Sequence, residues 1–175
     1  MYSASEFEVI CSDLEHAARL GVAGVVCGIL HEDNTVDEAR TSKLAKLAGP
    51  MEVTFHRAFD QTPNLARALE QVIACGCHRV LTSGGGPSAG ESESMLVALV
   101  EQARERVRIA AGGGITTAIA ASLLARTHLD LHASLRRRLV VDAKEDPNPV
   151  VGSEPAFELQ VWDVRAMVQV IESME

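Results

Sequence analysis

No apolar stretch of the sequence approaches the roughly 20 residues that a transmembrane helix needs, which argues against a membrane protein. The N-terminal segment, MYSASEFEVI, has neither the basic start nor the apolar core of a signal peptide. We therefore expect a cytoplasmic protein. Its four cysteines, Cys11, Cys27, Cys75 and Cys77, are expected to be reduced.

Basic residues are also scarce. The formal net charge is -8, so the chain lacks the phosphate-neutralising surface of a nucleic-acid-binding protein. The one basic run, at 136–138, is predicted to lie in a solvated loop. With 47% hydrophobic and 23% charged residues, the composition is that of a globular protein, and 175 residues suit one domain spanning 1–175.

Several motifs that would define a function directly are missing. The sequence has no CxxC pair with zinc-site spacing and no HExxH. Gly112-Gly113-Gly114 is not a Walker loop, because no Gly-Lys-Ser/Thr follows it. Any chemistry must therefore come from residues that the fold brings together.

Helical and strand patterns alternate along the chain, which predicts parallel strands joined by helical crossovers. Ser5 and Glu8 resemble a capping box, and Thr62-Pro63 resembles another helix start. Strands are expected at 22–27, 51–55, 78–82, 108–111 and 129–132, and helices at about 5–20, 36–48, 62–76, 93–106, 116–126 and from 163 onward. Residues 135–156 hold three of the six prolines and are predicted to form a mobile loop. Five parallel strands can form an open sheet, whereas a (β/α) barrel needs eight strands and about 250 residues.

Polar residues and glycines follow the predicted strands, where ligands bind in parallel α/β folds. The candidates after successive strands are His56, Arg57 and Asp60, then Thr82 and Ser83, then Gly112, Gly113 and Gly114, and finally His132 and Ser134. Strand alternation puts Thr54 and His56 on one face of the sheet, and Asp130, His132 and Ser134 on one face. We expect these residues to line one ligand site.

Each candidate has a functional and a structural interpretation. His56 fits a general base or metal ligand, or a partly buried structural histidine. Arg57 fits an anion clamp, or a salt bridge with Asp60. Gly112–Gly114 fits an anion cradle before a helix, or a tight turn. Cys75 and Cys77 could hold a soft ion such as Cu(I), or pack as small apolar side chains.

The blocks VTFHRAFD (53–60), RVLTSG (79–84), GGGI (112–115) and LHAS (131–134), with YSASEF near the start, resemble the CutC family, which is named for copper homeostasis. The resemblance implies a TIM barrel, with the five strands corresponding to strands four to eight. The family's first three strands, which carry most of its proposed copper-ligand cysteines, have no counterpart here. Ile119 stands where the family has asparagine, and 135–155 matches poorly.

The resemblance implies a partial TIM barrel with a role in copper handling, for which Cys27, Cys75 and Cys77 are the candidate ligands. An alternative is an enzyme for a small anionic or phosphorylated metabolite. In that case His56 and His132 would be acid or base, Arg57 the anion clamp, Asp60 its neighbour, and Thr82, Ser83, Gly112–Gly114 and Ser134 would complete the site. A non-functional fragment is a third alternative. Because five strands leave two unpaired edges, we also expect self-association.

Overall fold

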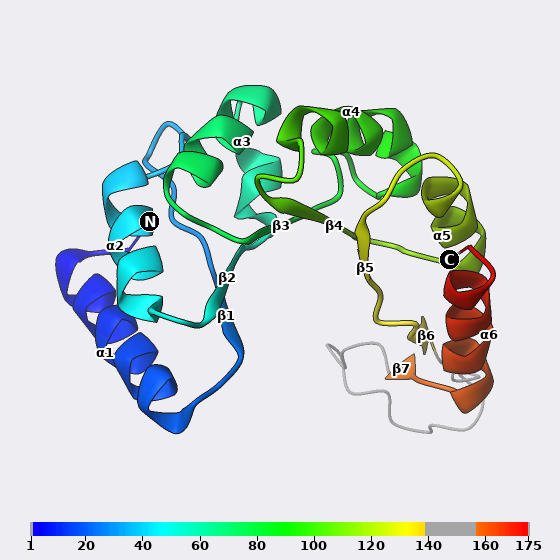
Figure 1. Cartoon of the computed structure of the whole chain (residues 1–175), viewed down its shortest axis with the longest axis horizontal. Coiled ribbons are helices and arrows are strands. Elements are labelled where there is room, and N and C mark those ends of the chain that lie inside the picture. The colour runs from blue at the N-terminus through cyan, green and yellow to red at the C-terminus, as the bar shows by residue number, and fades with distance from the viewer. Residues whose placement is uncertain (1, 139–156, 175) are drawn as a thin grey trace, which may run out of the picture.

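The computed structural model describes residues 2–138 and 157–174, which form an arch of parallel strands with helices along its outer side (Figure 1). The main sheet contains β1 (Gly24–Cys27), β2 (Glu52–Phe55), β3 (Arg79–Thr82), β4 (Arg108–Gly112) and β5 (Asp130–His132). The helices are α1 (Ala4–Leu20), α2 (Glu38–Ala48), α3 (Leu65–Ala74), α4 (Glu93–Ala103), α5 (Thr117–Leu124) and α6 (Val161–Glu172), with short 3-10 turns η1 (Arg57–Gln61) and η2 (Gly90–Ser92). The predicted alternation is confirmed, and each strand begins or ends within two residues of its predicted bounds.

The five strands are parallel and pair in chain order, β1-β2-β3-β4-β5. Val26 lies opposite Thr54, and Arg79 lies opposite both Thr54 and Arg108. All five carboxyl ends therefore meet at one edge of the sheet, as the grouping of candidate residues requires. Among the described residues, β1 and β5 each pair with a strand on one side only.

The hydrophobic core lies between the sheet and the helices. Strand residues that point outward are buried there, including Val53, Phe55, Val80 and Ala111, which the helices cover. Residues that alternate with them point into the hollow of the arch and are more exposed. Val26 on β1 is 64% exposed, although it lies in the middle of a strand. The sheet thus has one dry face and one open face.

Two predicted helix starts are wrong by two residues. The capping box is Ser3 with Glu6, not Ser5 with Glu8: Ser3 Oγ accepts from the Glu6 N–H, and the Glu6 carboxylate accepts from the Ser3 N–H at 2.7 Å. Both pairs fit the same motif, so the sequence alone does not separate them. Helix α3 is capped by Asn64, while the Thr62 hydroxyl donates to the Phe59 carbonyl and closes η1. In the described part, no helix is long and apolar enough to cross a membrane.

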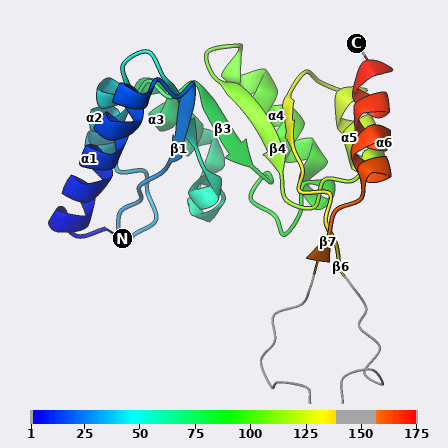
Figure 2. The same ribbon diagram turned by 90° about the horizontal axis from the view of Figure 1, so that it is seen from below.

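Residues 139–156, most of the segment predicted to be a mobile loop, lie outside the described residues. Within that segment, Arg137–Arg138 forms the short strand β6, which pairs antiparallel with β7 (Phe157–Glu158). Figure 2 shows this pair beyond the end of the main sheet. The Arg136 guanidinium lies 5.0 Å from the centre of the Phe157 ring, so a cation–π contact accompanies the pairing.

Candidate functional site

The turn that follows β2 presents the first group of candidate side chains. His56 caps the 3-10 turn η1, with its Nδ1 accepting from the Ala58 N–H at 3.2 Å. Phe59, in the middle of the turn, is fully buried and anchors it to the core. Because Phe59 points inward, Arg57 and Asp60 on either side of it are directed toward the neighbouring strand ends.

Asp60 is the centre of a hydrogen-bond network that joins β2 to β3. Its carboxylate is only 9% exposed and accepts from Arg57 Nε at 2.8 Å. It also accepts from the Thr82 hydroxyl, from the Ser83 N–H at 3.0 Å and from the Gly85 N–H at 3.1 Å. The predicted salt bridge between Arg57 and Asp60 is therefore present.

The electrostatics of this network keep Asp60 ionised. Burial raises the pKa of its carboxyl, but the hydrogen bonds from Thr82, Arg57, Ser83 and Gly85 outweigh that effect and lower the pKa below its ordinary value. Because the carboxylate oxygens already accept these four hydrogen bonds, they have no free lone pair for a substrate proton. The arrangement favours a positioning role for Asp60 over proton transfer.

Arg57 extends from β2 across β3 toward the loop after β4. Its Nη2 donates to Ser83 Oγ at 2.9 Å, and Ser83 Oγ in turn donates to the Gly86 carbonyl. Gly113 has a φ of +100, which favours glycine, and a Cβ atom there would lie only 3.2 Å from Arg57 Nη1, so the backbone approaches the guanidinium closely. With Nε and Nη2 occupied, Nη1 is the part of the half-exposed guanidinium that is left for a ligand.

Gly112–Gly114 forms the turn between β4 and α5. The Gly113 carbonyl accepts from the Ala89 N–H, which fixes the loop before η2 against this turn. Thr116 caps α5 by accepting from the Ile119 N–H at 3.3 Å. The glycines thus form a tight turn beside the Arg57 guanidinium, a few residues before the capped start of α5.

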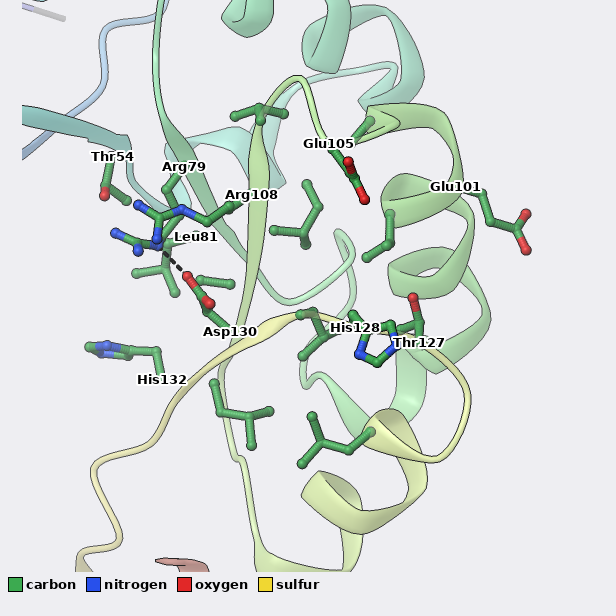
Figure 3. Close-up of a pocket in the computed structure, with 18 of the residues that line it drawn as sticks. Thr54, Arg79, Leu81, Glu101, Glu105, Arg108, Thr127, His128, Asp130 and His132 are labelled. Atoms are coloured by element: carbon green, nitrogen blue, oxygen red, sulfur yellow. Dashed lines mark hydrogen bonds and ion pairs between the residues drawn. The ribbon is translucent and has the colours of Figure 1, made fainter. Parts of the chain in front are cut away.

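His132, at the end of β5, and Ser134, just after it, lie on the side of the candidate residues that is away from β2. His132 pairs with Gly112 across β4 and β5, and its exposed imidazole points into the hollow of the arch (Figure 3). Ser134 is exposed beyond the end of the strand. Hydrogen bonds and close approaches connect Arg57, Asp60, Thr82, Ser83 and Gly113. We name these residues, together with His56, Gly112, Gly114 and His132, the strand-end site.

Sequence reasoning missed two features near these residues. Gly28 follows β1, and a Cβ atom there would lie 2.7 Å from His56 Nδ1, so this glycine leaves room for the imidazole. Its position directly after an apolar strand was the available signal. The Gly85 N–H, in the loop after β3, likewise donates to Asp60.

The second missed feature is a layer of ion pairs at the opposite ends of the strands. Arg79 Nε lies 2.5 Å from Asp130, and Arg108 Nη2 lies 2.5 Å from Glu52 (Figure 3 draws the first pair). Each of these pairs skips one strand, β4 in the first case and β3 in the second. Alternate strands supply one layer of side chains in the interior of a TIM barrel, and these pairs follow that rule.

Two of the three candidate copper ligands, Cys75 and Cys77, precede β3 and lie away from the strand-end site, whereas Cys27 ends β1 and its carbonyl accepts from the His56 N–H at 2.9 Å. Cys75 and Cys77 are buried, and the Cys75 thiol donates to the Glu38 carbonyl at 3.6 Å. Burial raises the pKa of Cys27 to about 11 and that of Cys77 to about 12, and it also raises the pKa of Cys75. Within 2–138 and 157–174, no group of three or more histidine, cysteine, aspartate or glutamate residues is arranged to hold a metal ion. The described residues therefore do not form a ready-made copper site.

A run of parallel strand–helix units, bent into an arch with polar groups at the carboxyl ends, defines a partial TIM barrel. Residues 1–137 match the model of the CutC family, and the chain belongs to that family. The predicted fold class and the predicted family are thereby confirmed.

Relatives of known sequence agree with this membership. The family protein CutC of Chromobacterium violaceum is 47% identical over 137 residues, a match that covers 78% of this chain and 56% of that protein. The family protein CutC of Xanthomonas campestris pv. campestris (strain B100) is 39% identical over 177 residues, covering 99% and 73%. The chain spans about half to three quarters of the length of the curated relatives it matches.

Solved structures show the same fold. A CutC protein from Streptococcus agalactiae, whose proposed role is copper homeostasis, superposes with a TM-score of 0.68 and 28% identity over 75% of this chain and 64% of that one. Inosine 5'-monophosphate dehydrogenase from Legionella pneumophila superposes with a TM-score of 0.57 over 98% of this chain and 62% of that one. At 12% identity, the second likeness concerns the fold alone.

Proposed function

We propose that the strand-end site binds a small anion, such as the phosphate group of a metabolite, and that Arg57 Nη1 contacts it. The single observation that carries this proposal is the orientation of Arg57. A buried carboxylate holds one edge of its guanidinium, and the remaining nitrogen faces Gly113. A fixed guanidinium beside a glycine turn at a helix start suits an anionic group.

Two histidines lie on either side of this arginine and would give the site its chemistry. His56 Nδ1 accepts a backbone hydrogen bond, so in the neutral ring the proton is on Nε2. His132 is exposed on β5. In this proposal the chain contributes to an enzyme, and the two imidazoles transfer protons to or from the bound metabolite.

Titration with inorganic phosphate tests the proposed contact. We expect Arg57→Met to weaken phosphate binding by roughly tenfold or more, because a charge-assisted contact is lost. Arg67→Met is the matched control, since Arg67 is exposed and its side chain makes no ion pair with the described residues. Binding is followed by isothermal calorimetry, and thermal melts verify that both variants fold. Equal affinities for the two variants, or no binding by the parent chain, would contradict the proposal.

Copper handling is the second candidate, because the CutC family is linked to copper homeostasis. Soft thiolate donors suit Cu(I), and the candidates in this chain are Cys27, Cys75 and Cys77. The pKa of Cys77 is raised first by burial and then by the charges of Cys27 and Cys75. We assign this function to the cytoplasm, where reduced thiols persist.

If these cysteines bind Cu(I), the apparent affinity should rise steeply with pH. Each thiol must lose its proton to become a ligand, and raised pKa values put that cost above neutral pH. We expect up to about tenfold tighter binding per pH unit for each proton released. Competition with a Cu(I) chelator measures this, with Cys75→Ala/Cys77→Ala as the test and the buried Cys11→Ala as the control. Unchanged binding in the double variant would remove these residues from consideration.

A further inference from the structure

Two hydrogen bonds hold the Arg57 guanidinium by one edge. Its Nε donates to Asp60 Oδ2 at 2.8 Å, and its Nη2 donates to Ser83 Oγ at 2.9 Å. The two accepting oxygens lie only 3.1 Å apart. Acceptors this close together can both be reached only from the edge on which Nε–H and one hydrogen of Nη2 point the same way. Asp60 and Ser83 therefore occupy the same side of the guanidinium.

The edge formed by Nη1 and the second hydrogen of Nη2, which we name the end edge, is left for a ligand. Among the residues that the structure describes, no acceptor receives a hydrogen bond from Nη1. The Arg57 side chain is 45% exposed, so a dissolved molecule can reach this edge. Two N–H groups that point in parallel match two oxygens carried by one atom.

Ser83 holds Nη2 in this orientation. Its side chain is fully buried directly after β3, where it cannot turn toward water. The hydroxyl has a single hydrogen, and its shorter donor contact is with the Gly86 carbonyl, at 2.7 Å, rather than with Asp60, at 3.1 Å. With that hydrogen donated to Gly86, the hydroxyl oxygen faces Arg57 as an acceptor. Ser83 thus connects the guanidinium to the loop that follows β3.

That loop is itself held at two points. A Cβ atom on Gly86 would lie 2.1 Å from Ser92 Oγ, so the chain at Gly86 folds closely against the start of α4. Further along, Ala89 is fully buried, and its N–H donates to the Gly113 carbonyl at 2.9 Å. The Gly86 carbonyl therefore has a fixed position, and the support of the arginine is organised before any ligand arrives.

We propose that the strand-end site binds an oxyanion through two oxygens of a single phosphate or carboxylate group, and that Ser83 is the positioning residue for this contact. The inference rests on the proposed anion binding and adds the geometry of the ligand. A single hydrogen bond to Asp60 would let the guanidinium pivot, whereas the second bond, to Ser83, fixes the direction of the end edge. A spherical anion would meet the charge but not both directed hydrogen bonds.

Rotation about the Nε–Cζ bond of Arg57 tests the role of Ser83 without any ligand. This rotation exchanges Nη1 with Nη2 and so must break the bond to Ser83, while the bond from Nε to Asp60 persists. In Ser83→Ala the two Nη signals should exchange roughly tenfold or more faster. Nitrogen-15 NMR of the full chain measures this, with the Arg57 signals identified by their loss in Arg57→Lys. Ser94→Ala, at an exposed position on α4, is the control, and equal rates in the two serine variants would overturn the proposal.

Anion titrations at constant ionic strength test the geometry of the ligand. Acetate and bromide carry the same single charge, but only acetate offers two oxygens on one atom, and phosphate offers such a pair on phosphorus. At least one of the two oxyanions should bind roughly tenfold or more tightly than bromide. Binding of phosphate but not acetate would identify a phosphate group as the anion of the ligand, and the reverse would identify a carboxylate. Bromide that bound as tightly as both would contradict the proposal and leave the anion site itself standing.

Arg57→Lys separates the directed contact from the charge. Lysine keeps the positive charge but has no planar edge, so this variant should bind the oxyanion as weakly as Arg57→Met. Ser83→Ala should weaken binding by roughly threefold or more, and Ser94→Ala should leave it unchanged. Thermal melts verify folding, and the two serine variants decide the matter if the lysine variant does not fold.

The outcomes separate this inference from the proposed function. Parent affinity in Arg57→Lys or in Ser83→Ala would mean that charge alone binds the anion, which overturns the inference but not the site. If the parent chain bound no anion although Ser83 slowed the rotation as expected, the proposed anion binding would be wrong, and the ligand assignment with it.

Discussion

Replacing Asp60 with asparagine should lower the free energy of unfolding by about 2–4 kcal/mol. The carboxylate accepts from Arg57, Thr82, Ser83 and Gly85, whereas an amide has one oxygen and an NH₂ group. In the variant, at least one buried donor faces another donor, and Arg57 loses its counter-charge. Chemical denaturation measures the change.

The exposed residue Asp13 supplies the control for this substitution. Asp13→Asn makes the same chemical change on the surface of α1 and should alter stability by less than about 0.5 kcal/mol. If Asp60→Asn were equally mild, the network would contribute little to the fold. Phosphate affinity of the variant should also fall, because Arg57 would no longer be held toward Gly113.

The effect of Asp60→Asn should depend on pH. The pKa of Asp60 in the folded chain lies below its ordinary value of 3.8, so the carboxylate stabilises the fold above that value. This contribution is lost as the pH falls through the folded pKa. The difference between the parent chain and the variant should therefore be full at pH 6 and should shrink below about pH 4. A difference that grew in acid would contradict this assignment.

Replacing Phe59 with alanine should cost about 3–5 kcal/mol, the range for a fully buried aromatic side chain. Phe59 has no exposed surface and anchors the turn that carries Arg57 and Asp60. The cavity left behind would loosen that turn, so phosphate binding should weaken together with stability. Urea denaturation and phosphate titration measure the two effects.

Phe157→Ala removes the same ring from a partly exposed position beside Arg136. We expect this control to cost less than about 1 kcal/mol, since little cavity forms and only an exposed cation–π contact is lost. Similar losses for the two phenylalanines would mean that Phe59 is not the anchor of the turn.

Much of the fold could be predicted because it follows from local pattern. Short apolar runs such as the one around Val53 and Phe55 are buried on the helix side, and the strand order follows the chain. The caps at Ser3 and Asn64 were missed because neighbouring residues offer equivalent side chains. Their choice depends on where the helix packs, which a local motif does not record.

The strand-end grouping was also predictable, since parallel strands place their carboxyl ends together. The role of Asp60 was not, because its donors come from Thr82, Ser83 and Gly85 on a different strand end. The close approach of Gly28 to His56 likewise depends on the register of β1 and β2. Such contacts are properties of the assembled sheet.

The ion pairs Arg79–Asp130 and Arg108–Glu52 each connect strands two apart across the hollow of the arch. All four side chains are partly exposed, so dissolved salt screens both pairs. Raising the ionic strength should therefore weaken these cross-strand links, while the backbone pairing of neighbouring strands and the core on the other face keep the sheet together.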